Sequence, residues 1–178
     1  MRKVISTCIA TLLMAAVSAQ TVDSIVIKRV DSLILVSVNL TAKRDFDQAL
    51  TVNAIAEEIT LEKLGRESAT YSSCCFNHGR IYYHKTDYTS AIPWFLKSKE
   101  IREKVFGKEH PNYAKVLNVL AVTYQKTGNY LNAELLYSEA LPILEKTVGK
   151  EHYDYTFGLN YLAALYYRKL DFEKAEQL

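Results

Sequence analysis

Two adjacent cysteines and a histidine form the most reactive cluster of side chains in the sequence. Cys74, Cys75 and His78 fall within about one turn of a helix, a spacing at which thiolates and an imidazole can bind zinc. A metal site needs further ligands, for which His84 is the nearest candidate, and a Cys–His nucleophile needs an orienting carboxylate that no spacing indicates. Cysteine is also a small core residue. We therefore expect this cluster to pack in a core, and we predict no catalytic residue, metal or cofactor.

Two further histidines stand at equivalent places in a repeated connector. Gly107-Lys108-Glu109-His110 and Gly149-Lys150-Glu151-His152 have the same sequence and lie 42 residues apart. Repetition in a connector is typical of helix capping or packing rather than of catalysis. The same interval links residues of matched size elsewhere: Tyr82, Tyr124 and Tyr166; Tyr88, Tyr130 and Phe172; Ala91, Ala133 and Ala175; Gly79, Ala121 and Ala163.

The interval of 42 residues divides most of the chain into internal repeats. Within each unit the apolar residues recur at intervals of three and four, which indicates helices. Gly65, Gly107 and Gly149 fit helix C-caps, and Pro111 fits the first turn of a following helix. Each unit is therefore predicted to be a helical hairpin that buries its apolar face against its neighbours. The units are residues 30–65, 72–107, 114–149 and an incomplete 156–178.

The spacing of these residues resembles the tetratricopeptide repeat. A small residue is followed by Tyr three positions later, and a turn then leads to Tyr, Ala and a second aromatic residue. The length of 42 residues, the Gly-Lys-Glu-His-Pro connector and the segments 117–124 and 141–146 are similar to the kinesin light chain type. Cys75, His78 and Ser98 depart from it. The resemblance covers about residues 30–178 and implies an all-α solenoid, a right-handed superhelix of stacked hairpins, that binds proteins and is not an enzyme.

The resemblance also implies a concave groove lined by the first helix of each unit. The groove is predicted to contain bases, amides and aromatic rings but no acid, which favours an extended, acidic to amphipathic peptide. Asn118 and Asn160 would bind its backbone. An ordinary solvated face is the alternative. Val122 and Ala164 stand where a carboxylate clamp for chaperone tails would need polar groups, which excludes that clamp. The predicted residues are Ser73, Phe76, Arg80, Tyr83, His84, Lys115, Asn118, Val122, Gln125, Lys126, Phe157, Asn160, Tyr167 and Arg168.

The N-terminal segment has the pattern of a secretory signal peptide. Arg2 and Lys3 precede an uncharged apolar run, and small residues at Val17 and Ala19 suit a signal peptidase. We predict cleavage after Ala19, a lead-in segment over residues 20–29, and a secreted or periplasmic location. The run is shorter than the roughly 20 residues of a membrane-spanning helix. An uncleaved N-terminal anchor is the alternative.

Charge limits the kinds of partner that the chain can bind, and cysteine content limits how the fold can be stabilised. The chain has 22 Lys and Arg and 20 Asp and Glu, and removal of Arg2 and Lys3 with the signal peptide leaves 20 of each. A nucleic-acid partner would require a basic excess, so we exclude it. No second apolar run is long enough to span a membrane. Cys74 and Cys75 point in different directions on a helix and do not bridge easily, so stability must come from helix packing.

Two functions fit this pattern. The first is an exported scaffold that binds a protein or peptide in the groove, and the second is the sensor or regulatory arm of a larger signalling or protease protein. The fourth unit stops at Leu178 in the middle of a helix, so we expect this sequence to be part of a longer chain. The oligomeric state is left open.

Overall fold

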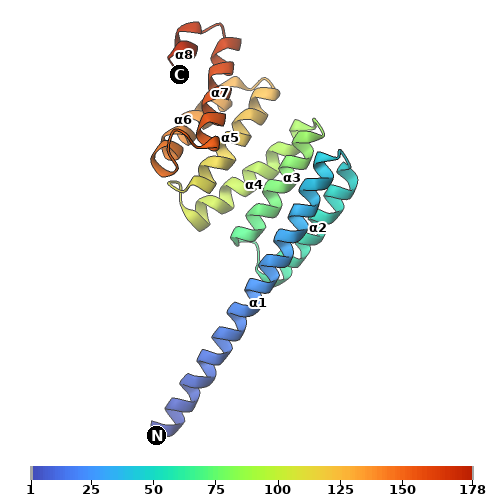
Figure 1. Ribbon diagram of the computed structural model, residues 1–178, viewed down its shortest axis with the longest axis vertical. Coiled ribbons are helices and arrows are strands. Elements are labelled where there is room, and N and C mark those ends of the chain that lie inside the picture. Colours follow the sequence, from blue (N-terminus) through green and yellow to red (C-terminus); the bar gives the residue numbers. More distant parts are fainter. Residues whose placement is uncertain (1, 178) are drawn as a thin grey trace.

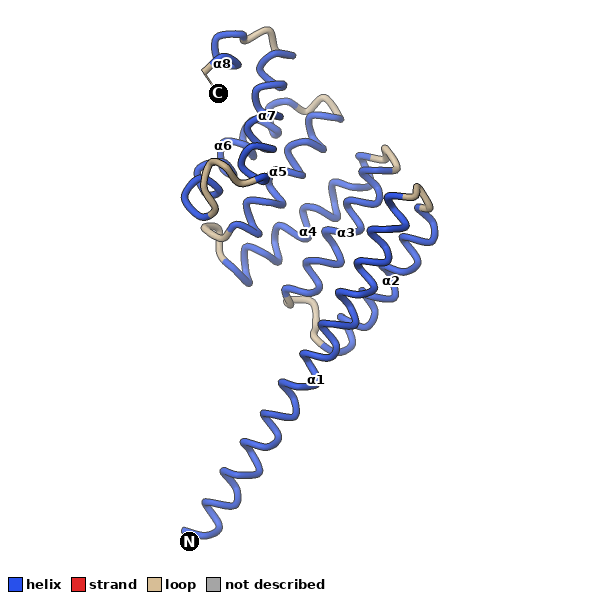
Figure 2. Tube along the Cα trace, in the orientation of Figure 1, coloured by secondary structure: helices blue, strands red, loops and turns tan. Residues whose placement is uncertain are grey.

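The computed structural model describes the backbone of residues 2–177 and the side chains of residues 21–177. Throughout this part of the chain the regular structure is helical, and successive helices form hairpins that stack side by side (Figures 1 and 2). The predicted all-α solenoid is therefore confirmed. The helices are α1 (Arg2–Ala42), α2 (Phe46–Lys63), α3 (Ala69–His84), α4 (Tyr88–Phe106), α5 (Pro111–Lys126), α6 (Tyr130–Thr147), α7 (Tyr153–Arg168) and α8 (Phe172–Glu176).

The signal peptide predicted for residues 1–19 lies outside the residues whose side chains are described, and so does Leu178. The N-terminal part of α1 continues beyond the stack of hairpins (Figure 1). Further along this helix, the apolar side chains of Val22, Ile25 and Ile27 are exposed. Within the described residues, no helix combines the length and the apolar character that crossing a membrane requires.

The helix starts follow the 42-residue interval. The second helices of the hairpins begin at Phe46, Tyr88, Tyr130 and Phe172, and α3, α5 and α7 begin at Ala69, Pro111 and Tyr153. Each second helix has an Asp or Asn cap whose side chain accepts a hydrogen bond from the backbone N–H three residues later, at 3.1–3.4 Å. These caps are Asp45, Asp87, Asn129 and Asp171.

The repeated histidines also cap helices, as the connector predicts. Nδ1 of His110 accepts a hydrogen bond from the backbone N–H of Asn112, and Nδ1 of His152 accepts one from Asp154, both at 3.1 Å. Gly107, with φ +81°, is the C-cap of α4. This left-handed region is the one that glycine enters without a steric cost. The predicted capping role of these residues is confirmed.

The core alternates small and aromatic residues. Ala91, Phe95, Ala133 and Tyr137 are completely buried, as their repeated pattern predicts. Gly79 is so close to Phe95 that a Cβ atom on it would lie 2.6 Å from Cε1 of the ring. Of the repeated tyrosines of the first helices, Tyr166 is buried, whereas Tyr82 and Tyr124 are only half-buried. Each of them packs its ring along the edge of a core cluster rather than inside it.

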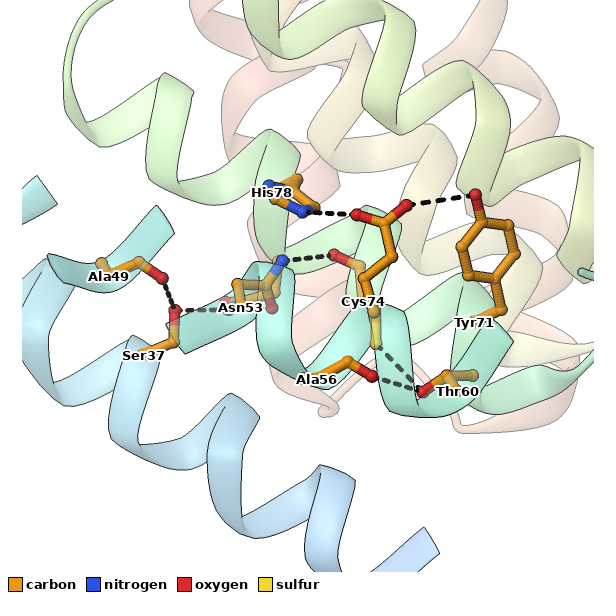
Figure 3. Close-up of polar contacts among 10 residues, drawn as sticks. Ser37, Ala49, Asn53, Ala56, Thr60, Tyr71, Cys74 and His78 are labelled. Atoms are coloured by element: carbon orange, nitrogen blue, oxygen red, sulfur yellow. Dashed lines mark hydrogen bonds and ion pairs between the residues drawn. The ribbon is translucent and has the colours of Figure 1, made fainter. Parts of the chain in front are cut away.

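A buried polar network joins the first three helices (Figure 3). The Ser37 hydroxyl donates to the carbonyl of Ala49 at 2.8 Å, and the Asn77 amide donates to the Ser37 hydroxyl and to Oδ1 of Asn53, both at 3.0 Å. The amide of Asn53 donates in turn to the carbonyl of Cys74 at 3.0 Å. Because these groups are buried and satisfied by one another, the network favours one register of α1, α2 and α3.

Candidate functional site

The first helices of three successive hairpins share a cavity. It has a volume of about 450 Å³ and is bounded by α3, α5 and α7. The lining residues are Phe76, Arg80, Tyr83 and His84 from α3, Lys115, Asn118, Val119 and Val122 from α5, and Tyr153, Asp154, Phe157 and Tyr161 from α7.

The structure brings part of the predicted groove together. The predicted residues that line the cavity are Phe76, Arg80, Tyr83, His84, Lys115, Asn118, Val122 and Phe157. The predicted residues outside its lining are Ser73, Gln125, Lys126, Asn160, Tyr167 and Arg168. Gln125 accepts a hydrogen bond from the Tyr137 hydroxyl at 3.3 Å, and Tyr167 is 65% exposed and packs on Phe172. Most of this second group lies toward the C-terminal ends of the helices, past the cavity.

Four lining residues were not predicted from the sequence: Val119, Tyr153, Asp154 and Tyr161. The repeat interval aligns Asp154 with Asn112, which is exposed and lies outside this cavity. The interval gives equivalent positions within units, but it does not give the rotation of one unit against the next. That rotation brings the first turn of α7 toward the middle of α5.

Asn118 holds two units together. Its side chain is only 2% exposed, and its amide donates to the backbone carbonyl of Asp154 at 2.7 Å. Gly158 makes room for it, since a Cβ atom at that position would lie 2.6 Å from Oδ1 of Asn118. One of the two N–H donors of the amide that we assigned to a peptide backbone is therefore already used within the chain. Asn160, its predicted counterpart, is exposed and does not line the cavity.

The predicted absence of acids from the groove is corrected by Asp154. Its Oδ2 lies 3.8 Å from Nζ of Lys115 and 3.8 Å from Nδ1 of His152. Burial lowers the pKa of Arg80, and among the described residues no acid forms an ion pair with this guanidinium. Burial also lowers the pKa of His84, and the nearby Arg80 lowers it further, so this ring is neutral at pH 7. Arg80 is therefore the unpaired cation of the described lining.

Aromatic rings line the same cavity as this cation. Phe157 packs against Tyr161 with a centroid distance of 4.6 Å and against Tyr153 at 5.8 Å. On the α3 side, Tyr83 packs edge-on against Tyr88 at 5.3 Å. Burial raises the pKa of Tyr83 to about 12, and the hydroxyls of Tyr161 and Tyr88 add to this effect. The Tyr83 hydroxyl therefore stays protonated and can donate a hydrogen bond to a ligand.

The cluster of Cys74, Cys75 and His78 belongs to the core, as predicted. Burial raises the pKa of the Cys74 thiol to about 11 and that of Cys75 to about 12, which leaves little nucleophilic thiolate at neutral pH. The sulfur of Cys74 contacts the Thr60 hydroxyl at 3.6 Å (Figure 3). His78 turns toward Glu57, a carboxylate that the sequence analysis did not consider. Among the described residues, no group of three or more His, Cys, Asp and Glu side chains is placed to hold a metal ion.

Comparison with known proteins identifies the same repeat. The profile of the tetratricopeptide repeat family matches residues 66–146 and 118–178. No curated protein sequence matches significantly. The fold is similar to BtubC (BKLC) of P. vanneervenii, with a TM-score of 0.75, 21% identity, and coverage of 83% of this chain and 59% of that protein.

Two further solved structures have the same fold. A kinesin light chain-type protein of Podosopora anserina, with nearly identical TPR-like repeats, has a TM-score of 0.75 and 20% identity, over 84% of this chain and 71% of that one. The apo form of RapI has a TM-score of 0.72 and 21% identity, over 84% of this chain and 40% of RapI. This chain is thus shorter than each of these proteins, and at such identities the likeness concerns the fold alone.

Proposed function

The chain belongs to the tetratricopeptide repeat family, and we propose that it is an exported scaffold that binds an extended, acidic to amphipathic segment of a partner protein. The binding site is the cavity across α3, α5 and α7. Stacked hairpins of this kind commonly mediate contacts between proteins, because they present a continuous concave surface. The observation that carries the proposal is the unpaired guanidinium of Arg80 in a cavity that aromatic rings also line.

The cavity lining suits a ligand that has one apolar part and one acidic part. Phe157 and Tyr161 line the cavity and can contact an apolar or aromatic side chain, and buried aromatic contacts supply most of the affinity of small interfaces. An acidic side chain of the ligand then pairs with Arg80. Lys115 is a weaker partner, because Asp154 already lies 3.8 Å from its ammonium group. A cavity of about 450 Å³ accommodates a few side chains rather than a folded domain.

Two arginine variants test this assignment. A peptide array selects a ligand, and fluorescence anisotropy then measures its affinity for each variant. Arg80→Gln should weaken binding by roughly 10-fold and reduce its salt dependence, because charge-assisted hydrogen bonds contribute about 1.5–3 kcal/mol. Arg168→Gln is the matched control, since Arg168 is exposed and lies outside the cavity lining, and its affinity should stay within about twofold of the native value.

The control variant and the peptide array also define the results that would contradict this assignment. Equal losses in Arg80→Gln and Arg168→Gln would mean that the ligand responds to overall charge, not to this cavity. Failure of the array to retain any acidic peptide would remove the ligand class. Captured partners that contact α4 and α6 instead would move the binding surface to the second helices.

Export is the second part of the proposal. It rests on the basic start, apolar run and small residues of positions 1–19. N-terminal sequencing of protein recovered outside the cytoplasm should start at Gln20. Recovery of exported protein that retains Met1 would show that the segment acts as an anchor, and protein confined to the cytoplasm would contradict export.

A further inference from the structure

Arg102 is a buried cation at a place where the other units have uncharged core residues. It lies near the C-terminal end of α4 and is 6% exposed. The 42-residue interval aligns it with Thr60 in the preceding unit and with Leu144 in the following one, both completely buried. Packing alone does not require a charge here, because Leu144 fills the equivalent space with an apolar side chain.

The guanidinium of Arg102 makes its contacts with neutral groups. Nη1 donates to the backbone carbonyl of Asn112 at 2.8 Å, and Cζ lies 4.6 Å from the centre of the Phe76 ring. Nε is buried and makes no hydrogen bond. Within the described part of the chain no carboxylate forms an ion pair with it. The acids of its own helix pair elsewhere, Glu100 with Lys104 at 3.3 Å and Glu103 with Lys108 at 3.4 Å. Asp31 lines the same hollow but forms no ion pair with Arg102. A buried charge without an ion-pair partner is costly, which favours binding of an anion beside this guanidinium.

A hollow next to Arg102 has space and donors for that anion. Its volume is about 260 Å³, and it is lined by Asp31, Ala69, Thr70, Ser72, Ser73, Arg102, Phe106 and Asn112. Ala69 and Thr70 are the first two residues of the 16-residue helix α3, so their N–H groups have no carbonyl partner within the helix. Unpaired N–H groups at a helix N-terminus favour an anion. The first residues of α3 and the buried Arg102 thus line the same hollow.

We propose that this hollow binds a small carboxylate monoanion, with Arg102 as its counter-charge and the start of α3 as a second source of N–H donors. The planar fork of a guanidinium matches the two oxygens of a carboxylate. Asp31, which also lines the hollow, disfavours a second negative charge and hence a phosphate dianion. Burial lowers the pKa of Arg102 to about 10, which still leaves it charged at neutral pH.

This site is separate from the cavity across α3, α5 and α7. The two linings share no residue, although Phe76, which lines the larger cavity, contacts Arg102. A carboxylate in the hollow has two sources, a free small acid or the C-terminus of a peptide. Acetate represents the first source, and a tripeptide with a free C-terminus, compared with its C-terminal amide, represents the second.

Titration of the full-length protein tests the site, with the side-chain Nε–H resonance of Arg102 as the reporter. Sodium acetate should shift this resonance to saturation, and sodium chloride at the same ionic strength should not. Arg102→Leu reproduces the residue of the next unit, so it should fold, and thermal stabilisation by acetate should disappear in it. Arg80→Gln should leave the acetate response unchanged. The experiment can therefore contradict this site without contradicting the proposed peptide cavity, and the reverse.

Asp31→Asn provides a second variant that keeps the guanidinium. Removal of the repelling carboxylate should tighten acetate binding several-fold. This result tests the proposed site even if Arg102→Leu does not fold. Binding of the tripeptide acid but not of its amide assigns the site to a chain terminus, and binding of acetate without either assigns it to a free acid. Equal stabilisation of native protein and Arg102→Leu, an unchanged affinity in Asp31→Asn, or tighter binding of inorganic phosphate than of acetate would overturn the proposal.

Discussion

Nε2 of His78 lies 2.9 Å from Oε2 of Glu57, and the His78 ring stacks on the indole of Trp94 with a centroid distance of 4.3 Å. The other carboxylate oxygen of Glu57 accepts a hydrogen bond from the Tyr71 hydroxyl at 3.2 Å (Figure 3). Burial lowers the pKa of His78 and outweighs the opposing attraction of Glu57. Helices α2, α3 and α4 therefore meet around an imidazole that the fold keeps neutral.

This imidazole should make the protein less stable in mild acid. The unfolded chain takes up a proton near the ordinary histidine pKa of 6.5, and the folded chain does so only at lower pH. The unfolded state consequently binds more protons below about pH 6.5, and the free energy of unfolding falls there. Urea denaturation at pH 7.5 and 5.5 measures the difference. His78→Gln should reduce it, with the exposed His152→Gln as control, and an undiminished difference in His78→Gln would contradict this role.

Gly79→Ala should destabilise the protein by about 1 kcal/mol. The new Cβ atom would lie 2.6 Å from Cε1 of the completely buried Phe95 ring, and overpacking costs about 1–3 kcal/mol. The gain in helix propensity on replacing glycine, roughly 1 kcal/mol, offsets only part of this cost. Chemical denaturation checks the prediction. Ala121→Gly, at the aligned position, is the control, and increased stability of Gly79→Ala would show that Phe95 moves aside freely.

Thr86→Gly should stabilise the protein by about 1 kcal/mol. Thr86 has φ +64° in the turn between α3 and α4, where the aligned residue of the next unit is Gly128 with φ +79°. A β-branched residue in this left-handed region is strained by roughly 1–2 kcal/mol, of which the greater flexibility of unfolded glycine cancels a part. The reverse change, Gly128→Thr, should destabilise by a similar amount. A melting temperature that falls in both variants would disprove the strain argument.

Helix α8 should exchange its amide hydrogens faster than the central helices do. None of the residues from Phe172 to Glu176 is buried, whereas α5 and α6 contain completely buried residues such as Leu117 and Tyr137. Local opening needs little free energy where few apolar contacts are broken. Hydrogen exchange with mass spectrometry compares Asp171–Gln177 with the two central helices. Equal protection would mean that a second molecule covers this end, and dilution of the protein would then restore fast exchange.

The sequence by itself determined the features that depend on local interactions. The helix starts, the histidine and glycine caps and the paired small and aromatic residues such as Gly79 and Phe95 follow from contacts within one hairpin. A cap joins residues two or three positions apart, and a helical face repeats every 3.6 residues. These rules apply in each unit, so the 42-residue interval is sufficient to find them.

Only the tertiary structure decided how the units meet. The bond from Asn118 to Asp154 crosses 36 residues, and the one from Asn77 to Ser37 crosses 40. Such contacts depend on the rotation and tilt between successive hairpins, which many small packing interactions set together and no single motif encodes. For the same reason the sequence alone does not distinguish Arg102 from any other charged residue on a helix. Its burial beside neutral groups exists only once α3, α4 and α5 have packed against one another.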